Sequence, residues 1–281
     1  MNVFITGASG GLGRALANEC GKRGYNLFLT DINAQGLKSI QLGLERQFGV
    51  TVTTAACDLT SDESVDQLLE TIDAYGIRFD MLLNVAGLDF EGGFLERARR
   101  DIIRIISLNN GATLRITHAI LSRRRENHPF YLLFTSSLAS MYPMPLKATY
   151  AASKRFLLDI AVALREELKD KQVNVLALCP GGLATTREAM SGIAAQGFWG
   201  GATTNPLEQV SRQTINRLLH RGGVLVPGAL NRTLTFFGKL LPRRWVAAAI
   251  YHRWNKAQKA WSPVEFSSGS SKGQTLQQEG T

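Results

Sequence analysis

The chain has 281 residues, 44% hydrophobic and 20% charged, which is typical of one large soluble domain or of one domain with an appendage. Its three cysteines lie far apart in apolar runs, which excludes a disulfide framework and favours reduced core residues in a cytoplasmic protein. Neither those cysteines nor the four scattered histidines have metal-ligand spacing, so no metal site is expected. We also expect no secretory signal and no membrane-spanning segment, because a strand and a glycine loop follow Met1 directly and the apolar runs are short.

The net charge of +9 belongs to one C-terminal segment. Residues 1–208 hold 21 basic and 21 acidic residues, and residues 265–281 hold one Lys and two Glu. Residues 209–264 hold ten Lys or Arg and no Asp or Glu. This segment therefore needs an explanation of its own.

Short apolar runs alternate with amphipathic stretches along the first 180 residues. The runs predict strands at 2–6, 25–31, 51–56, 79–84, 129–136 and 172–179. The amphipathic stretches predict helices near 11–23, 34–48, 61–75, 95–127 and 149–171. This alternation indicates an α/β fold with a doubly wound, Rossmann-type parallel sheet and helices on both faces. The continuous apolar character of the later strands is typical of strands that are covered on both faces.

The pattern changes after Pro180-Gly181-Gly182. Residues 183–204 predict a substrate loop with short helical turns. A helix near 206–220 and a seventh strand at 223–226 complete the sheet, so residues 1–228 form the expected Rossmann domain. Residues 229–261 then predict a basic amphipathic helical extension, interrupted at Pro242, and residues 262–281 predict a disordered tail.

A glycine-rich loop, Thr6-Gly7-Ala8-Ser9-Gly10-Gly11-Leu12-Gly13, lies between the first strand and the first helix. Small residues let the backbone approach a pyrophosphate, and the following helix presents free N–H groups and its positive dipole end. A tight turn without a ligand is the alternative. The strand before the loop and the helix after it favour dinucleotide binding.

Two aspartates follow the second and third strands. Asp31 ends the second strand, where a carboxylate accepts hydrogen bonds from the adenosine ribose and repels a 2′-phosphate. No Lys or Arg lies beside it, so NAD is favoured over NADP. Asp58, which precedes Leu59, stands where it would meet the adenine amino group, and capping the next helix is its alternative role.

Further motifs occur at the ends of expected elements and in a fixed order. They are Asn84-Val85-Ala86-Gly87, Asn109, Ser137, Tyr150-Ala151-Ala152-Ser153-Lys154 and Pro180-Gly181. Together with the glycine loop they resemble the short-chain dehydrogenase/reductase superfamily, in its compact single-domain form, over about residues 2–190. Val85 departs from the usual Asn, a residue that mainly supports the turn.

The resemblance implies a catalytic group of Asn109, Ser137, Tyr150 and Lys154. Tyr150 would be the acid/base, and Lys154, four residues later on the same helix face, would lower its pKa and bind the nicotinamide ribose. Ser137 would hydrogen-bond the reacting oxygen, and Asn109, preferred over Asn110, would hold a water that relays protons to Lys154. The implied cofactor contacts are Gly7, Ser9, Gly11, Leu12, Gly13, Asp31, Asp58, Leu59, Asn84, Ala86, Gly87, Tyr150, Lys154, Pro180, Gly181 and Thr185.

The residues that follow the catalytic positions are mostly apolar or aromatic, which indicates a lipophilic secondary alcohol or ketone, of the steroid or acyl-chain kind. The candidate pocket residues are Leu88, Phe90, Leu138, Met141, Tyr142, Met144, Leu183, Phe198 and Trp199. Packing of several of them beneath the substrate loop is the alternative.

The basic segment at 230–261 mixes aromatic and aliphatic residues with Lys and Arg. It suits packing over the sheet edge, contact with a second subunit, or an anionic membrane surface. Nucleic acid is not expected, because no recognition motif accompanies the charge. The resemblance also implies a homodimer or homotetramer.

Three classes of function fit this fold. The sequence favours an NAD(H)-dependent alcohol dehydrogenase or carbonyl reductase. A catalytically silent NAD(H)-binding protein, regulatory or membrane-associated, would have no chemical need for all four catalytic residues. An epimerase or dehydratase usually needs a larger substrate domain than the roughly 100 residues that follow Pro180.

Overall fold

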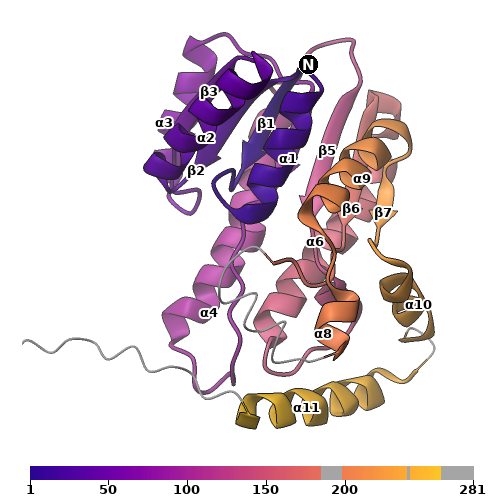
Figure 1. The fold of residues 1–281 in the computed structure, drawn as a ribbon. Coiled ribbons are helices and arrows are strands. Elements are labelled where there is room, and N and C mark those ends of the chain that lie inside the picture. Colours follow the sequence, from indigo (N-terminus) through magenta and orange to yellow (C-terminus); the bar gives the residue numbers. More distant parts are fainter. Residues whose placement is uncertain (185–197, 239–240, 261–281) are drawn as a thin grey trace, which may run out of the picture.

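The computed structural model describes residues 1–184, 198–238 and 241–260, and the side chains within these ranges except at 198–200 and 253–260. Seven strands form one sheet in the order β3-β2-β1-β4-β5-β6-β7, and every neighbouring pair is parallel (Figure 1). The strands are β1 (Asn2–Thr6), β2 (Asn26–Asp31), β3 (Val52–Ala56), β4 (Met81–Asn84), β5 (Phe130–Thr135), β6 (Val173–Leu178) and β7 (Gly223–Leu225). The expected doubly wound parallel sheet is confirmed.

Helices cover both faces of this sheet. One face packs against α1 (Gly11–Lys22), α2 (Ala34–Phe48) and α9 (Leu207–His220), through Leu16, Leu37 and Val210 among others. The other face packs against α3 (Asp62–Ala74), α5 (Thr113–Leu121) and α6 (Ala148–Glu167), through residues such as Ile72, Ile116 and Leu157. The inner strands β4, β5 and β6 are therefore buried on both sides, which explains their continuous hydrophobic sequences.

The order of the strands creates a topological switch point between β1 and β4. From β1 the chain continues to β2 and β3 on one side, and it then crosses back to β4 on the other side of β1. In open α/β sheets, ligands bind beyond the carboxyl ends of the strands at such a switch point. The glycine loop follows β1 and therefore lies at this switch point.

The long helix expected at 95–127 is divided and shorter. Its pieces are α4 (Arg99–Ile106), a π-helical turn η1 (Ser107–Ala112) and α5, which ends at Leu121. Residues 94–96 form a turn before α4, and the backbone at Asn127 has a left-handed φ of 57°. Single π turns inside helices often occur at functional sites, because they move one side chain out of helical register.

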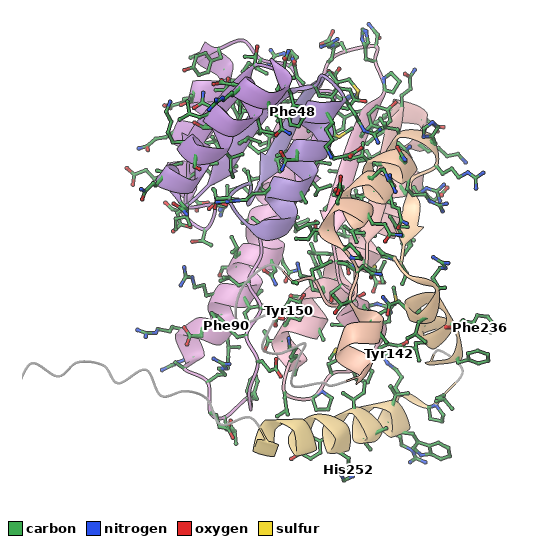
Figure 2. The ribbon with its side chains drawn as sticks, in the orientation of Figure 1. Phe48, Phe90, Tyr142, Tyr150, Phe236 and His252 are labelled. Carbon is green, nitrogen blue, oxygen red and sulfur yellow. The ribbon has the colours of Figure 1, made fainter. Side chains whose placement is uncertain are left out.

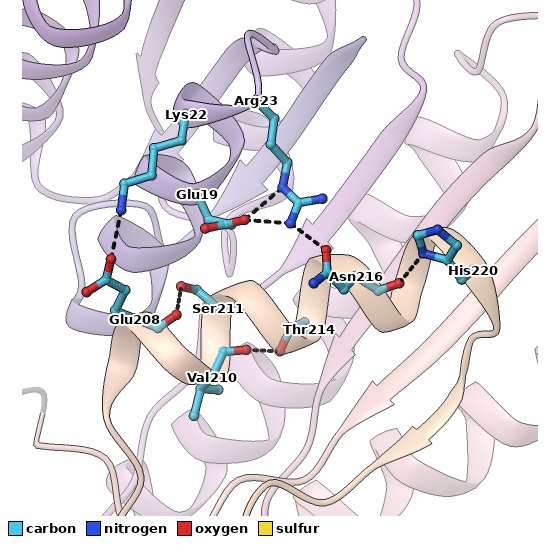
Figure 3. A network of polar contacts seen from close by, with 9 residues as sticks. All are labelled: Glu19, Lys22, Arg23, Glu208, Val210, Ser211, Thr214, Asn216 and His220. Carbon is cyan, nitrogen blue, oxygen red and sulfur yellow. Dashed lines mark hydrogen bonds and ion pairs between the residues drawn. The ribbon is translucent and has the colours of Figure 1, made fainter.

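Ion pairs join the first helix to a late one, α9. The Lys22 Nζ lies 2.8 Å from a Glu208 carboxylate oxygen, and Arg23 donates a hydrogen bond of 2.6 Å to Asn216 (Figure 3). Arg23 also pairs with Glu19 within α1. Residues nearly 200 positions apart thus hold the glycine-loop helix against the end of the domain.

The C-terminal part contains three further helices, α8 (Phe198–Thr203), α10 (Ala229–Gly238) and α11 (Arg243–Ala260). The gap between α10 and α11 contains Pro242, where the sequence predicts an interruption. The expected disordered tail at 262–281 lies outside the described residues. Among the helices that the structure describes, none is both long enough and apolar enough to cross a membrane.

Candidate active site

The glycine loop forms a cradle that side chains would fill. Gly7 has a left-handed φ of 65°, and a Cβ built there would lie 2.7 Å from the backbone nitrogen of Ala86. A Cβ on Gly13 would collide with the carbonyl oxygen of Gly7. Gly10 precedes α1 and offers no side-chain cap to the first-turn N–H groups. Free N–H groups at a helix N-terminus favour an anion, so the loop fits a dinucleotide pyrophosphate.

Asp31 lies beside this loop, at the end of β2. One carboxylate oxygen accepts a hydrogen bond of 2.9 Å from the Ser9 N–H, and the other accepts one of 3.0 Å from the Asn33 N–H. An ionised carboxyl has lone pairs for further donors, so Asp31 remains able to bind ribose hydroxyls. The Asp31 carboxylate therefore holds the glycine loop at Ser9.

Asp58 is exposed after β3 and does not cap the next helix. Its Oδ1 accepts hydrogen bonds from the Thr60 hydroxyl (2.6 Å) and the Thr60 N–H (2.9 Å), and these bonds hold the pKa of Asp58 below its ordinary value. The Ser61 hydroxyl caps α3 instead. The capping alternative for Asp58 is thus wrong, because a residue three positions later has the right geometry.

A narrow cavity lies at the switch point of the sheet, too tight to enclose a water molecule. It is lined by Thr6, Leu59, Asn84, Ala86, Leu108, Ala112, Thr113 and Ile116. The Thr6 hydroxyl accepts hydrogen bonds from the N–H groups of Val85 and Ala86, at 3.0 and 3.2 Å. The buried Asn84 Oδ1 has no hydrogen-bond partner among the described residues. The described side chains therefore leave this acceptor available to a donor from outside the protein.

Three parts of the chain bring the four expected catalytic residues together. Tyr150 and Lys154 lie on α6, Ser137 follows β5, and Asn109 lies in the π turn η1. The Ser137 hydroxyl and the Tyr150 phenol form a hydrogen bond, and the Lys154 ammonium lies 5.7 Å from the centre of the Tyr150 ring. Figure 2 shows Tyr150 at the lower end of the sheet, on the side toward α11.

Asn109 is buried and holds the segment after β4 against α6. Its Oδ1 accepts a hydrogen bond of 2.7 Å from the Leu88 N–H, and its Nδ2 donates to Leu88 O (3.0 Å) and Ser153 Oγ (2.9 Å). A Cβ on Gly87 would lie 3.1 Å from both Asn109 Oδ1 and Lys154 Nζ. These two polar atoms therefore face the same small space.

Burial controls the electrostatics of Tyr150 and Lys154. Burial raises the pKa of Tyr150 above its ordinary value, the nearby Asp89 carboxylate raises it further, and the bond to Ser137 lowers it. Burial lowers the pKa of Lys154 to about 8, although its ammonium donates a hydrogen bond of 2.9 Å to Thr135 O. Lys154 does not lower the pKa of Tyr150 in the free protein, because the lowered pKa of Lys154 leaves its amine neutral at the pH at which Tyr150 would ionise.

A cluster of three charged residues near Tyr150, made of Lys147, Asp89 and Glu91, is not predicted from the sequence. Lys147 Nζ lies 2.7 Å from Asp89 Oδ2, 3.4 Å from Glu91 and 5.6 Å from the centre of the Tyr150 ring. The only sequence signal is the i, i+3 spacing of Lys147 and Tyr150, which places both on one face of a helical turn. This ion-pair cluster adds charge to one side of the acid/base candidate.

A second cavity, open to solvent and with about 50 Å³ of internal space, lies next to Tyr150. Its lining is Phe90, Gly92, Phe94, Arg97, Asp101, Ile102, Ile105, Leu146, Lys147, Ala148, Thr149 and Tyr150. Of the expected pocket residues, only Phe90 lines it. Met141 and Leu183 pack against the two cores instead, and the Tyr142 hydroxyl bonds Thr235. The side chains of Phe198 and Trp199 lie outside the described residues.

The remaining expected cofactor residues follow β6. Pro180 is buried, and its carbonyl oxygen accepts a hydrogen bond of 2.8 Å from the Leu138 N–H. This bond joins the end of β6 to the segment that carries Ser137. A Cβ on Gly181 would collide with the carbonyl oxygen of Thr203 in α8. Thr185 lies outside the described residues.

The sequence matches a known family over most of its length. The family model for the short chain dehydrogenases matches residues 1–193, so this chain belongs to the short chain dehydrogenase family. The match contains the glycine loop and all four residues of the expected catalytic group.

Two curated relatives and one solved structure extend this comparison. Human 17-beta-hydroxysteroid dehydrogenase type 3 is 30% identical over 185 residues, and the very-long-chain 3-oxoacyl-CoA reductase of Bos taurus is 30% identical over 187. Each match covers 65% of this chain and 59% of the relative, so the chain spans about three fifths of their length. A short-chain dehydrogenase from Sphingobium yanoikuyae in complex with NADPH superposes with a TM-score of 0.72 and 25% identity, over 85% of this chain and 92% of that one.

Proposed function

We propose that this chain is an oxidoreductase that transfers a hydride between NAD(H) and a lipophilic secondary alcohol or ketone. One observation carries the proposal: the Ser137 hydroxyl, the Tyr150 phenol and the Lys154 ammonium meet beside the glycine cradle. The named activities of the two curated relatives, a dehydrogenase and a reductase, support chemistry at a hydroxyl or carbonyl carbon.

Each catalytic residue has a role that its surroundings support. Tyr150 gives its phenolic proton to the carbonyl oxygen in reduction and accepts a proton from the alcohol in oxidation. Ser137 orients the same oxygen through its hydroxyl. Lys154 binds the cofactor ribose, and its amine stabilises the phenolate only while it is protonated. The Asn109 amide uses both of its hydrogens on Leu88 and Ser153, which leaves an oxygen lone pair for a water directed toward Lys154.

A nicotinamide cofactor, when bound, supplies the hydride. The pyrophosphate would lie on the first turn of α1, within the cradle made by Gly7 and Gly13, and the adenine side would lie near Asp58. The residues proposed to hold it are Gly7, Ser9, Gly11, Leu12, Gly13, Asp31, Asp58, Leu59, Asn84, Ala86, Gly87, Tyr150, Lys154, Pro180, Gly181 and Thr185.

Asp31 supports NAD as the preferred cofactor, because its carboxylate would face a 2′-phosphate. Asp31→Ser removes that repulsion, and we expect kcat/KM for NADP relative to NAD to rise about 100-fold. Steady-state kinetics with both cofactors measures the ratio, with Asp58→Ser as the matched control. A ratio that stays unchanged in Asp31→Ser would contradict this assignment.

The aromatic and aliphatic walls of the larger cavity support a lipophilic substrate. We expect turnover with steroid-like or acyl-chain ketones, and we expect Phe90→Ala to raise their KM about 10-fold or more. A substrate panel that also contains polyols and sugars tests both points. Activity confined to the small polar compounds would overturn the substrate class.

Exposed apolar side chains on two adjacent helices support a homodimer. Ile103 and Ile106 on α4 are 57% and 42% exposed, and Phe156 and Val162 on α6 are 42% and 48% exposed. We propose that a second copy covers this face, since paired helix faces of this kind bury apolar area together. Sedimentation velocity should show a dimer for the natural chain and a monomer for Phe156→Glu. A natural chain that sediments as a monomer at all concentrations would exclude it.

All three cysteines are buried, and none of them forms a disulfide. Buried thiols of this kind support a reducing compartment, and we propose that the catalytic part of the chain works in the cytoplasm.

A further inference from the structure

Large apolar side chains lie exposed on α10, on α11 and between them. Phe236 and Phe237 are 64% and 62% exposed on α10, Leu241 is 53% exposed, and on α11 Trp245 and Tyr251 are 60% and 43% exposed. Exposed apolar residues that gather in one region, and do not lie scattered singly, indicate a contact surface.

The charge of this region has one sign. Residues 230–261 contain seven Lys or Arg and no Asp or Glu. Of these, Arg232, Arg243 and Arg244 are exposed residues of the described part of the chain. The exposed aromatic residues therefore lie within a cationic surface, which we call the α10–α11 surface.

Each of the two helices has one side packed against the body of the protein and another side exposed to solvent. On α10, Asn231 and Thr235 are buried, and Asn231 donates hydrogen bonds to Pro227 O and Thr203 O. On α11, Val246 and Ile250 are half-buried, while Trp245 and His252, which lie two turns apart on one face, are exposed. Figure 2 shows Phe236 pointing away from the body and His252 on the outer side of α11.

The α10–α11 surface lies at the same end of the molecule as the larger cavity. α11 runs across the end of the sheet where α4 and α6 begin (Figure 1), and Tyr150 and Phe90 lie above it (Figure 2). Phe94, which lines the cavity, is itself 61% exposed, and the adjacent Leu95 is 96% exposed. A lipophilic compound that leaves a bilayer at this end would have a short path to the cavity.

We propose that the α10–α11 surface docks on an anionic lipid bilayer, with the aromatic side chains at the interface and the arginines among the lipid headgroups. Trp, Tyr, Phe and basic residues are the side chains that interfacial helices use, and each cation near an anionic surface adds to its affinity. Charge disfavours a second copy on this surface, because the exposed Arg232, Arg243 and Arg244 of one chain would face the same three arginines of the other, and residues 230–261 hold no acidic partner. This proposal does not depend on the catalytic one.

Sedimentation of the full chain with phosphatidylcholine vesicles, with and without phosphatidylserine, tests the proposal. We expect co-sedimentation with the anionic vesicles that weakens as salt rises, and much weaker binding to the neutral ones. Three of the four tryptophans lie within 230–261, so a blue shift of tryptophan emission should accompany binding.

Two double variants separate the apolar and the ionic contributions. Phe236→Ser with Phe237→Ser, and Arg243→Gln with Arg244→Gln, should each weaken binding to the anionic vesicles about 10-fold or more. The matched control is Lys38→Gln with Leu42→Ser on α2, where Leu42 is 55% exposed, and it should bind like the natural chain. Circular dichroism verifies that each variant is folded.

Three outcomes would overturn the proposal. The first is a folded natural chain that stays in the supernatant with anionic vesicles. The second is an equal weakening of vesicle binding in the α2 control, which would indicate nonspecific electrostatic and hydrophobic attraction without a defined surface. The third is self-association that the Phe236/Phe237 variant abolishes while vesicles bind nothing, which would assign the surface to a second copy.

Discussion

Tyr150→Phe is expected to lower kcat about 10²- to 10⁴-fold and to leave cofactor binding nearly intact. The phenol is the only proton donor that we place on the reacting oxygen, and general acid–base catalysis contributes about this factor. Phenylalanine retains the aromatic ring, so the packing of α6 and the distance from the ring to the Lys154 ammonium should change little. Steady-state turnover measures the first quantity, and NADH fluorescence titration measures the second.

Ser137→Ala is the companion variant for this experiment. It removes the hydroxyl that bonds Tyr150, so kcat should fall while the pH profile of kcat moves upward, since that bond lowers the Tyr150 pKa. A Tyr150→Phe protein that turns over like the natural chain would exclude Tyr150 as the acid/base.

Lys154→Met is expected to lower turnover about 10²-fold or more and, at pH 7, to increase stability. Burial lowers the pKa of Lys154 to about 8, whereas the unfolded chain has a lysine pKa near 10.4. The cost of the buried charge is therefore present below pH 8 and disappears as the pH rises through about 10.4. Removing it should raise the free energy of unfolding by up to about 3 kcal/mol, less about 1 kcal/mol for the lost bond to Thr135.

Urea unfolding between pH 7 and 10.5 checks the sign of this effect. The natural chain should gain stability across that range from this group, and the Lys154→Met chain should lack that gain. Lys147→Met is the matched control, because Lys147 pairs with Asp89 and Glu91 and its removal should not stabilise the protein. A Lys154→Met protein that is less stable than the natural chain at pH 7 would show that Lys154 is structurally favourable.

The strands could be predicted because their signal is local. Each is a continuous apolar run between helices of amphipathic pattern, and such runs suit only a sheet covered on both faces. The divided helix at 99–121 could not be predicted in the same way. The π turn at Asn109 and Asn110 is held by bonds to Ser153 on α6, and a contact between elements so distant in sequence leaves no periodic signal.

The candidate site likewise contains some features that the sequence predicts and others that it does not. The glycine loop and the pair Tyr150 and Lys154 have fixed spacings, so the sequence predicts where they lie. The Asp89–Lys147 pair depends on the approach of two loops, for which Gly92 N–H donates to Leu146 O, and nothing in the sequence reports that approach. Met141 and Leu183 follow catalytic positions in the sequence, but their side chains turn into the cores, because adjacency does not determine direction.

The proposal of hydride transfer is tested most directly with cofactor labelled by deuterium at the reactive nicotinamide carbon. The natural chain would be incubated with the labelled NADH and a lipophilic ketone, and the product alcohol analysed by mass spectrometry. We predict an alcohol with one deuterium on the carbinol carbon, formed about 10²- to 10⁴-fold more slowly by Tyr150→Phe. A natural chain that binds NADH and yields no labelled alcohol from any ketone of the panel would contradict the proposal, and would indicate a silent binding protein on this fold.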